Sequence, residues 1–159
     1  MIPQEIAESL KTNFPDGILE TKTEGVFDPY ARVAPEKIKA VALFMRDNEE
    51  MAFDYLMCLS GVDYSNGKLG VVYNLSSMKR GHKFTLKVDV PVEHPHIQSV
   101  ESVWKTANWH EREAYDLIGI VFDGHPDLRR ILLPDDWEGH PLRKDYKVPE
   151  YYRGMKVPY

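Results

Sequence analysis

Six histidines and a single cysteine are the side chains in this 159-residue sequence best suited to metal or nucleophilic chemistry. His110-Glu111 begins like the helical zinc motif of metalloproteases, which needs a second histidine four residues after the first. Position 114 is alanine, so the sequence excludes that site. His94 and His96 flank a proline and could chelate a metal, but without further ligands the pattern favours two surface side chains.

His125 and His140 each lie in a Gly-His-Pro turn and are the remaining candidates for proton transfer. An imidazole titrates near neutral pH and could act as a general base in a free-standing enzyme. However, the sequence has no glycine-rich phosphate loop and no nucleophile elbow to accompany them. The pattern therefore favours imidazoles that satisfy backbone groups of their own loops.

A dense charged cluster occupies the sequence just after His110. Arg112 and Asp116 are four residues apart and can pair on a helix surface. Glu111 and Glu113 are two carboxylates that could share acid–base work, but no second group supports that role. Two basic pairs follow later in the chain: Arg129-Arg130 and Arg143-Lys144. Taken singly, these charges are typical of solvated surfaces.

Composition excludes several classes of protein. The chain has 20 Lys and Arg against 25 Asp and Glu, a net charge of −5, which argues against non-specific nucleic-acid binding. One cysteine, Cys58, cannot form an internal disulfide, a cysteine zinc site or an iron–sulfur cluster. The first residues lack the basic and apolar regions of a secretory signal peptide. The longest apolar run, Ala40 to Met45, is too short to span a membrane.

Hydrophobic periodicity predicts the elements that must position these residues. We expect helices over residues 1–12 and 36–48, and strands over 18–24, 30–33, 53–64, 69–75 and 84–90. The nearly continuous apolar run from Phe53 to Tyr64 predicts a central strand covered on both faces. Asn66-Gly67 predicts a hairpin turn. Strict alternation from Phe84 to Val90 predicts a half-exposed antiparallel strand.

Two further helices are expected before the chain changes character. The first carries Ile97, Val100, Val103 and Trp104 at helical spacing. The second begins at Asn108 as N-cap, with Glu111 completing a capping box, and ends at Gly119. Together the elements predict an α+β fold, in which a mixed, largely antiparallel sheet is covered by helices in a two-layer domain over residues 1–133.

Residues 134–159 form an extended, irregular C-terminal tail with no helical or strand period. The tail contains four prolines, five aromatic residues and ten charged residues, so it cannot bury itself and is too aromatic for a solvated linker. The aromatic and proline residues are Trp137, Tyr146, Tyr151, Tyr152, Tyr159, Pro134, Pro141, Pro149 and Pro158. We expect this tail to become ordered on the surface of a partner.

Two blocks of sequence resemble a known family. The run from Glu111 to Ile120, followed by Phe122 and the segment 125–132, resembles the signature of the 30 kDa subunit of respiratory complex I, the proton-translocating NADH–quinone oxidoreductase of bacteria. The block 139–146 is similar to the C-terminal motif of the same family. The resemblance is most specific over residues 109–146, whereas the first hundred residues agree in length and element order.

The resemblance implies a peripheral-arm subunit that is not catalytic when isolated and binds no cofactor, with FMN and iron–sulfur clusters in partner subunits. It implies two main partners, the 49 kDa-like subunit and the adjacent small iron–sulfur subunit, at the cytoplasmic face of the bacterial inner membrane. An alternative within the family is a subunit of a membrane-bound hydrogenase or of a ferredoxin-fed quinone reductase.

The resemblance also changes the weight given to the charged residues, which it assigns to ion pairs within the subunit or across an interface. The signature and interface residues that it implies are Glu111, Arg112, Glu113, Asp116, His125, Pro126, Arg129, Arg130, Trp137, His140, Leu142, Arg143, Lys144, Asp145 and Tyr146.

Overall fold

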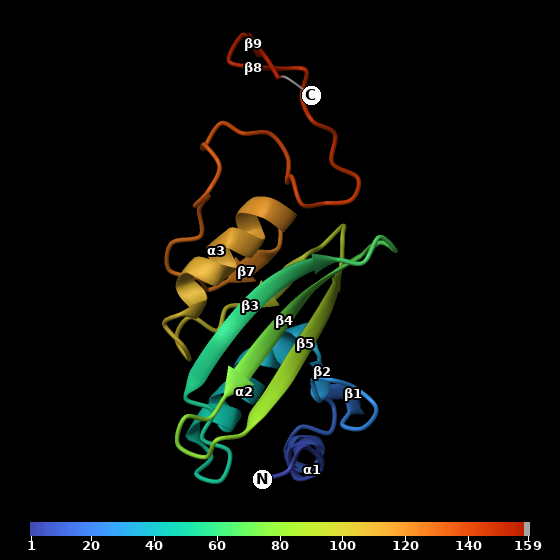
Figure 1. Ribbon diagram of the computed structural model, residues 1–159, viewed down its shortest axis with the longest axis vertical. Helices are drawn as coiled ribbons and strands as arrows, with labels where there is room; N and C mark the ends of the chain where they lie inside the picture. The colour runs from blue at the N-terminus through green and yellow to red at the C-terminus, as the bar shows by residue number, and fades with distance from the viewer. Residues whose placement is uncertain (158–159) are drawn as a thin grey trace.

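The computed structural model describes residues 1–157, so Pro158 and Tyr159 of the expected tail lie outside the described residues. A five-stranded mixed sheet has the strand order β1-β2-β5-β4-β3, and only β2 and β5 are parallel neighbours (Figure 1). The elements are α1 (Pro3–Asn13), β1 (Ile18–Lys22), β2 (Tyr30–Val33), the 3₁₀ turn η1 (Pro35–Lys37), α2 (Ile38–Asp47), β3 (Tyr55–Asp63), β4 (Lys68–Ser76), β5 (Lys83–Pro91), β6 (His96–Gln98), α3 (Ala107–Ile118), β7 (Val121–Asp123), β8 (Tyr151–Tyr152) and β9 (Met155–Lys156).

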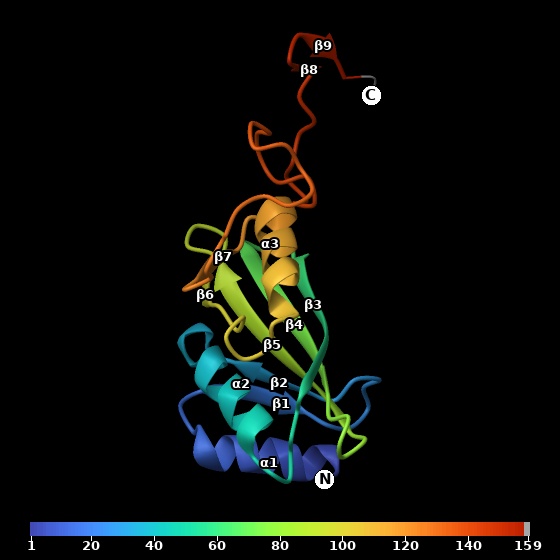
Figure 2. The ribbon, with the colours of Figure 1, turned by 90° about the vertical axis from the view of Figure 1, so that its left-hand side faces the viewer.

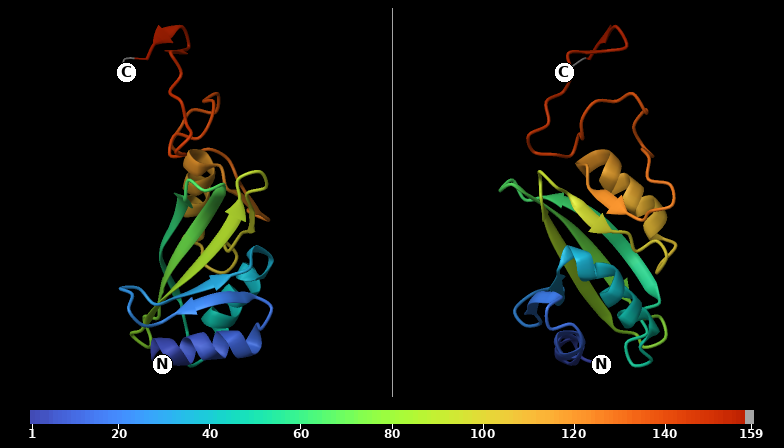
Figure 3. Two further views of the ribbon diagram at one scale, coloured as in Figure 1. Left: turned by 90° about the vertical axis from the view of Figure 1, so that its right-hand side faces the viewer. Right: turned by 180° about the vertical axis from the view of Figure 1, so that it is seen from behind.

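Helices α2 and α3 cover one face of the sheet, and the opposite face is open (Figures 2 and 3). The covered face is apolar because alternate side chains of a strand point to opposite faces. Its fully buried residues on the two middle strands are Leu69, Val71, Tyr73 and Leu75 of β4 and Leu86 and Val88 of β5. The α+β fold class, with a mixed and largely antiparallel sheet, is thereby confirmed.

Strand β3 lies at the edge of the sheet, so the expectation of a central strand was wrong. A β-bulge between Leu56 and Cys58 shifts the register, which places Leu56 and Leu59 in the core although they are three residues apart. This irregularity made the sequence read as continuously apolar. Helix α3 packs against the strand at Gly61, where an added Cβ would lie 3.2 Å from side-chain atoms of Ala114 and Ile118.

The expected helix through residues 97–104 is not formed. Residues 96–98 are the short strand β6, which pairs in parallel with β7, and tight turns follow it. In these turns the N–H groups of Val103 and Trp104 donate to the Val100 carbonyl, which imitates helical spacing in the sequence. The Trp104 indole is buried and donates to the Phe53 carbonyl at 2.9 Å.

Helix α3 ends at Gly119, which has the left-handed φ of 85° expected of a helix-terminating glycine. Its beginning differs from the expectation, because Asn108 lies inside the helix and Thr106 precedes it without a side-chain cap. Glu111 completes no capping box, since its carboxylate is buried against the segment that follows β6.

Candidate functional site

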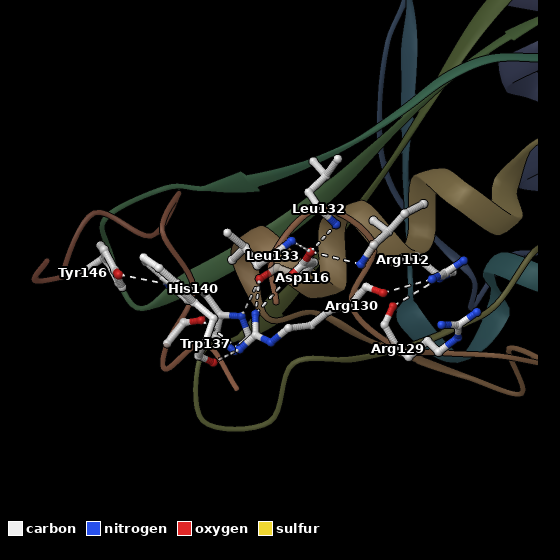
Figure 4. Close-up of polar contacts among 11 residues, drawn as sticks. Arg112, Asp116, Arg129, Arg130, Leu132, Leu133, Trp137, His140 and Tyr146 are labelled. Atoms are coloured by element: carbon white, nitrogen blue, oxygen red, sulfur yellow. Dashed lines mark hydrogen bonds and ion pairs between the residues drawn. The ribbon is translucent and has the colours of Figure 1, made fainter. Parts of the chain in front are cut away.

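Asp116 lies at the centre of a hydrogen-bonded cluster between α3 and the chain that follows β7 (Figure 4). The side chain has no solvent exposure. Its Oδ1 accepts from Arg130 Nη1 at 2.7 Å. Its Oδ2 accepts the N–H groups of Ile131, Leu132 and Leu133 at 3.1, 2.8 and 2.9 Å. One carboxylate therefore fixes three successive residues of a segment that has no helix or strand.

These contacts also determine the charge of Asp116. Burial acts to raise its pKa, but the hydrogen bonds from the Leu133 N–H, from Arg130 and from the other two amides outweigh burial. The net effect is a pKa below the ordinary aspartate value, so the group is a buried carboxylate paired within its own chain.

Two guanidinium groups hold the same segment through its carbonyls. Arg112 donates to the carbonyls of Arg129 and Arg130 at 3.1 and 2.9 Å. Arg130 in turn donates from Nη2 to the carbonyls of Trp137 and Gly139 at 2.8 and 3.1 Å. The helical spacing of Arg112 and Asp116 allowed a direct pair, but the ion pair of Asp116 is made with Arg130.

The C-terminal tail closes the end of α3. The last carbonyls of a helix lack partners within the helix and carry the negative end of its dipole. Here the donors are His140 Nδ1 to Asp116 O at 3.0 Å, the Leu142 N–H to Leu117 O at 2.9 Å and Arg143 Nε to Ile118 O at 2.7 Å. The Gly-His-Pro-Leu-Arg block is therefore a cap for a helix more than twenty residues earlier in the sequence.

Gly119 and the His140 ring are in close contact at this cap. A Cβ at position 119 would lie 2.6 Å from His140 Cδ2, so only glycine fits both the left-handed backbone and the ring. His125 is held in a comparable way, with Nε2 3.0 Å from the Asn108 carbonyl and Nδ1 accepting the Asp127 N–H at 3.0 Å. Both imidazoles thus satisfy backbone groups, as their sequence patterns favoured.

Beyond the cap, polar contacts hold the tail together. Trp137 donates from its indole N–H to the Tyr146 hydroxyl at 3.1 Å, and its ring lies 5.0 Å from that of Tyr152 between centroids. Asp136 accepts from the Tyr152 hydroxyl and from Arg153 Nε, both at 2.8 Å. These contacts link the loop at residues 136–137 to the β8–β9 hairpin, which extends away from the sheet (Figure 2).

The chain itself does not cover the apolar side chains of this region. From residue 123 to residue 157, no residue is fully buried. The large apolar side chains that are more than half exposed here are Leu132, Leu142, Val148, Tyr151 and Met155. The segment is ordered by polar contacts while much of its apolar surface faces solvent, which is typical of a protein-binding surface.

Glu111 shows a different use of a buried carboxylate. It has no solvent exposure, and it accepts the Ser99 hydroxyl at 2.5 Å and the Val100 N–H at 2.7 Å. Burial raises its pKa to about 7, against the lowering effect of these two hydrogen bonds. Glu111 has no ion-pair partner among residues 1–157, so the ion pair that the resemblance implied for it was wrong.

The other expected interface residues lie at the surface. Arg129 pairs with the exposed Asp127 at 3.0 Å. The backbone N–H of Lys144 donates to Asp63 at 2.8 Å, which ties the tail to the end of β3, while its side chain is exposed. The remaining exposed members of the set are Glu113, Pro126 and Asp145.

Sequence reasoning missed Trp109, which is 71% exposed. It lines a hollow of about 230 Å³ together with His110, Glu113, Ile131 and Leu132. The signal was available, because residues nine apart lie on opposite sides of an α-helix and Ile118 belongs to the apolar stripe. The contact between Asp63 and the tail had no such signal.

Residues 1–157 contain no metal-binding cluster of the usual kind. No three or more His, Cys, Asp and Glu residues in this part of the chain gather as metal ligands. His94 and His96 stack with ring centroids 4.3 Å apart, and His96 pairs with Asp123 at 2.9 Å. Within the same residues no helix is long and apolar enough to cross a membrane.

Comparison with known proteins decides the family. A sequence model described as "Respiratory-chain NADH dehydrogenase, 30 Kd subunit" matches residues 31–152, which include the whole Asp116 cluster and most of the tail. The chain belongs to this family. The family resemblance drawn from residues 109–146 is thereby confirmed.

Similar curated sequences are named as the corresponding subunit of NADH-quinone oxidoreductase. The chain is 52% identical to that of Chloroherpeton thalassium over 99% of its own length and 66% of the relative. It is 60% identical to that of Chlorobium phaeobacteroides, over 75% of this chain and 73% of the relative. The corresponding protein of Salinispora tropica is 48% identical, and the match spans 79% of this chain and 54% of the relative.

Two solved structures share the fold of this 30 kDa-type subunit. The trypsin-resistant fragment (1-134) of Nqo5 has a TM-score of 0.65 and 31% identity, over 80% of this chain and 100% of that one. A chain of the membrane-bound sulfane sulfur reductase, an archaeal respiratory membrane complex, has a TM-score of 0.74 and 23% identity, over 91% of this chain and 85% of that one.

Proposed function

We propose that this chain is a cofactor-free assembly subunit in the peripheral arm of a proton-translocating NADH–quinone oxidoreductase. In this role it helps to form the arm through which electrons pass from NADH, by way of FMN and iron–sulfur centres in partner subunits, to quinone. The observation that carries the proposal is the C-terminal segment, which is fixed to α3 by polar contacts while its apolar side chains stay exposed. Such a surface is suited to a partner protein.

The proposed partners are the 49 kDa-like subunit and the small iron–sulfur subunit, which would hold the chain at the cytoplasmic face of the inner membrane. Within the signature, two groups of residues would act differently. Arg112, Asp116 and Arg130 would shape the interface from inside. The residues that would contact a partner directly are Trp137, Leu142, Lys144, Asp145 and Tyr146.

We propose that the chain divides into an α+β domain over residues 1–133 and a partner-binding tail over residues 134–159. The related Nqo5 offers support, since its trypsin-resistant fragment (1-134) aligns with 80% of this chain. A protease-sensitive region outside a compact domain is expected of a tail that becomes covered only in the complex.

The isolated chain is proposed to be non-catalytic, because the ring nitrogens of His125 and the Nδ1 of His140 are engaged by backbone groups. The alternative assembly is a membrane-bound hydrogenase or a ferredoxin-fed quinone reductase. The fold recurs in another respiratory membrane complex, so the fold does not separate these assemblies.

A pull-down of the tagged chain from native membranes in mild detergent tests the proposal. We expect flavin-binding and iron–sulfur subunits to co-elute, and the purified chain alone to show no flavin absorption and no NADH oxidation. A co-eluting nickel-ligating large subunit would support the alternative assembly. Elution of the chain alone, or NADH oxidation by the pure chain, would contradict the assembly role.

A further inference from the structure

We propose that residues 143–157, here called the distal arm, bind inside an acidic cleft of a partner protein. This inference rests on the proposed function and adds the chemistry and shape of the surface that receives the tail. Three features of the distal arm carry it: its charge, its unpaired cations and the two-sided exposure of its hairpin.

The charge of the distal arm is opposite to that of the remaining chain. The arm contains five Lys and Arg against two Asp and Glu, a net charge of +3. Because the whole chain carries −5, the residues outside the arm carry −8. A basic segment on an acidic subunit is attracted to acidic surfaces elsewhere and steers the encounter with them.

The cations of the arm are available for a partner. No carboxylate among residues 1–157 lies within ion-pairing distance of Lys147 or Lys156, and both side chains are exposed. Arg153 is paired with Asp136 but remains 63% exposed. The arm therefore presents several positive charges that its own chain leaves in solvent.

The hairpin at the end of the arm offers apolar contacts on both faces. In an antiparallel pair, directly opposed residues lie on the same face. Tyr151 opposes Lys156 and Tyr152 opposes Met155, so Tyr151 and Met155 lie on opposite faces, with 61% and 64% of each residue exposed. A flat bilayer could cover only one of these faces, whereas a protein cleft covers both.

The hairpin conformation is already set in the free subunit. Its two turn residues, Arg153 and Gly154, both have positive φ, as a tight two-residue hairpin requires. Asp136 holds Tyr152 and Arg153 from outside the arm. Ordering a segment before binding reduces the entropic cost of association, so the arm is suited to enter a cleft as a preformed unit.

The test measures binding of the chain to detergent-solubilised oxidoreductase from cells that lack this subunit. The variant K147E/K156E reverses two unpaired charges of the arm, and the control K79E/K83E reverses two exposed lysines near the β4–β5 turn, at the opposite end of the molecule (Figure 1). At low ionic strength we expect the arm variant to associate about tenfold more slowly and with a weaker salt dependence, and the control to match the parent.

Equal association rates and equal salt dependence for the arm variant and the control would overturn the acidic cleft. If deletion of the arm still abolished binding, the proposed function would stand while this inference failed. Vesicles of phosphatidylglycerol provide a second probe. Vesicle binding that is lost in K147E/K156E, together with unchanged binding to the solubilised complex, would instead identify an anionic membrane and also overturn the inference.

Discussion

Asp116 accepts four hydrogen bonds through its carboxylate, all from residues 14 to 17 positions later in the chain. In D116N the amide nitrogen cannot accept hydrogen bonds, and the Arg130 guanidinium loses its counter-charge. We expect a loss of about 3 kcal/mol in the free energy of unfolding, measured by urea denaturation. The matched control is D127N, which removes an exposed partner of Arg129 and should change stability far less. Equal losses in the two variants would contradict the buried role of Asp116.

Glu111 predicts a pH dependence whose sign follows from its raised pKa. The folded chain holds this proton up to about pH 7, whereas the unfolded chain releases it near the ordinary value of 4.5. The folded state is therefore favoured below the unfolded value, and that stability is lost as the pH rises to about 7. The loss attributable to Glu111 is roughly 3 kcal/mol.

E111Q tests this pH dependence, because glutamine resembles the protonated carboxyl in shape and cannot ionise. Urea denaturation of parent and variant between pH 5 and about pH 8 should show a decline in the parent that is largely absent in the variant. Equal slopes in both proteins would show that Glu111 does not titrate in this range.

At the scale of the residue, sequence reasoning found the participants but not their partners. The Arg112–Asp116 spacing predicted a local pair, yet the ion pair joins Asp116 to Arg130, on a segment without regular structure. Glu111 read as a capping residue and is buried against Ser99. Both outcomes depend on how distant segments pack, which local spacing does not encode.

At the scale of the element, the cap on α3 depends on Gly119. G119A would add strain at a φ of 85° and place a methyl group against the His140 ring. The control is G124A, where φ is 81° and an added Cβ meets no atom within 4 Å. Strain alone should cost each variant about 1–2 kcal/mol.

Because only G119A displaces His140, we expect it to be the less stable variant and to be cleaved faster by trypsin after Arg143 or Lys144. Thermal unfolding and timed proteolysis of both variants measure these effects. Equal cleavage rates would mean that the cap does not hold the tail.

The elements themselves were predictable where hydrophobic periodicity is regular. The stripe of α2 and the alternation of β5 gave the right element types. The pattern misled at residues 97–104, where turns place apolar residues at helical intervals, and at β3, where a bulge disguises an edge strand. The cap on α3 was not predictable, because its acceptors are backbone carbonyls that leave no signal in the sequence.

At the scale of the whole molecule, the fold class and the family were both evident from the sequence, because the signature is long and the element order is regular. The structure adds that the signature joins two parts of the chain. Its first block forms α3 and the Asp116 cluster, and its second block caps the same helix and leads into the distal arm. A function in assembly accounts for both blocks, since the body fixes the position from which the arm extends.

The most direct measurement compares the full chain with a variant that ends at Tyr146. This variant keeps the cap on α3 and the Trp137–Tyr146 contact, and it removes the hairpin and both unpaired lysines. We predict an unchanged thermal unfolding midpoint and at least about a tenfold loss of co-purification with the oxidoreductase subunits. Recovery of the shortened chain in the complex at the level of the full chain would contradict the account.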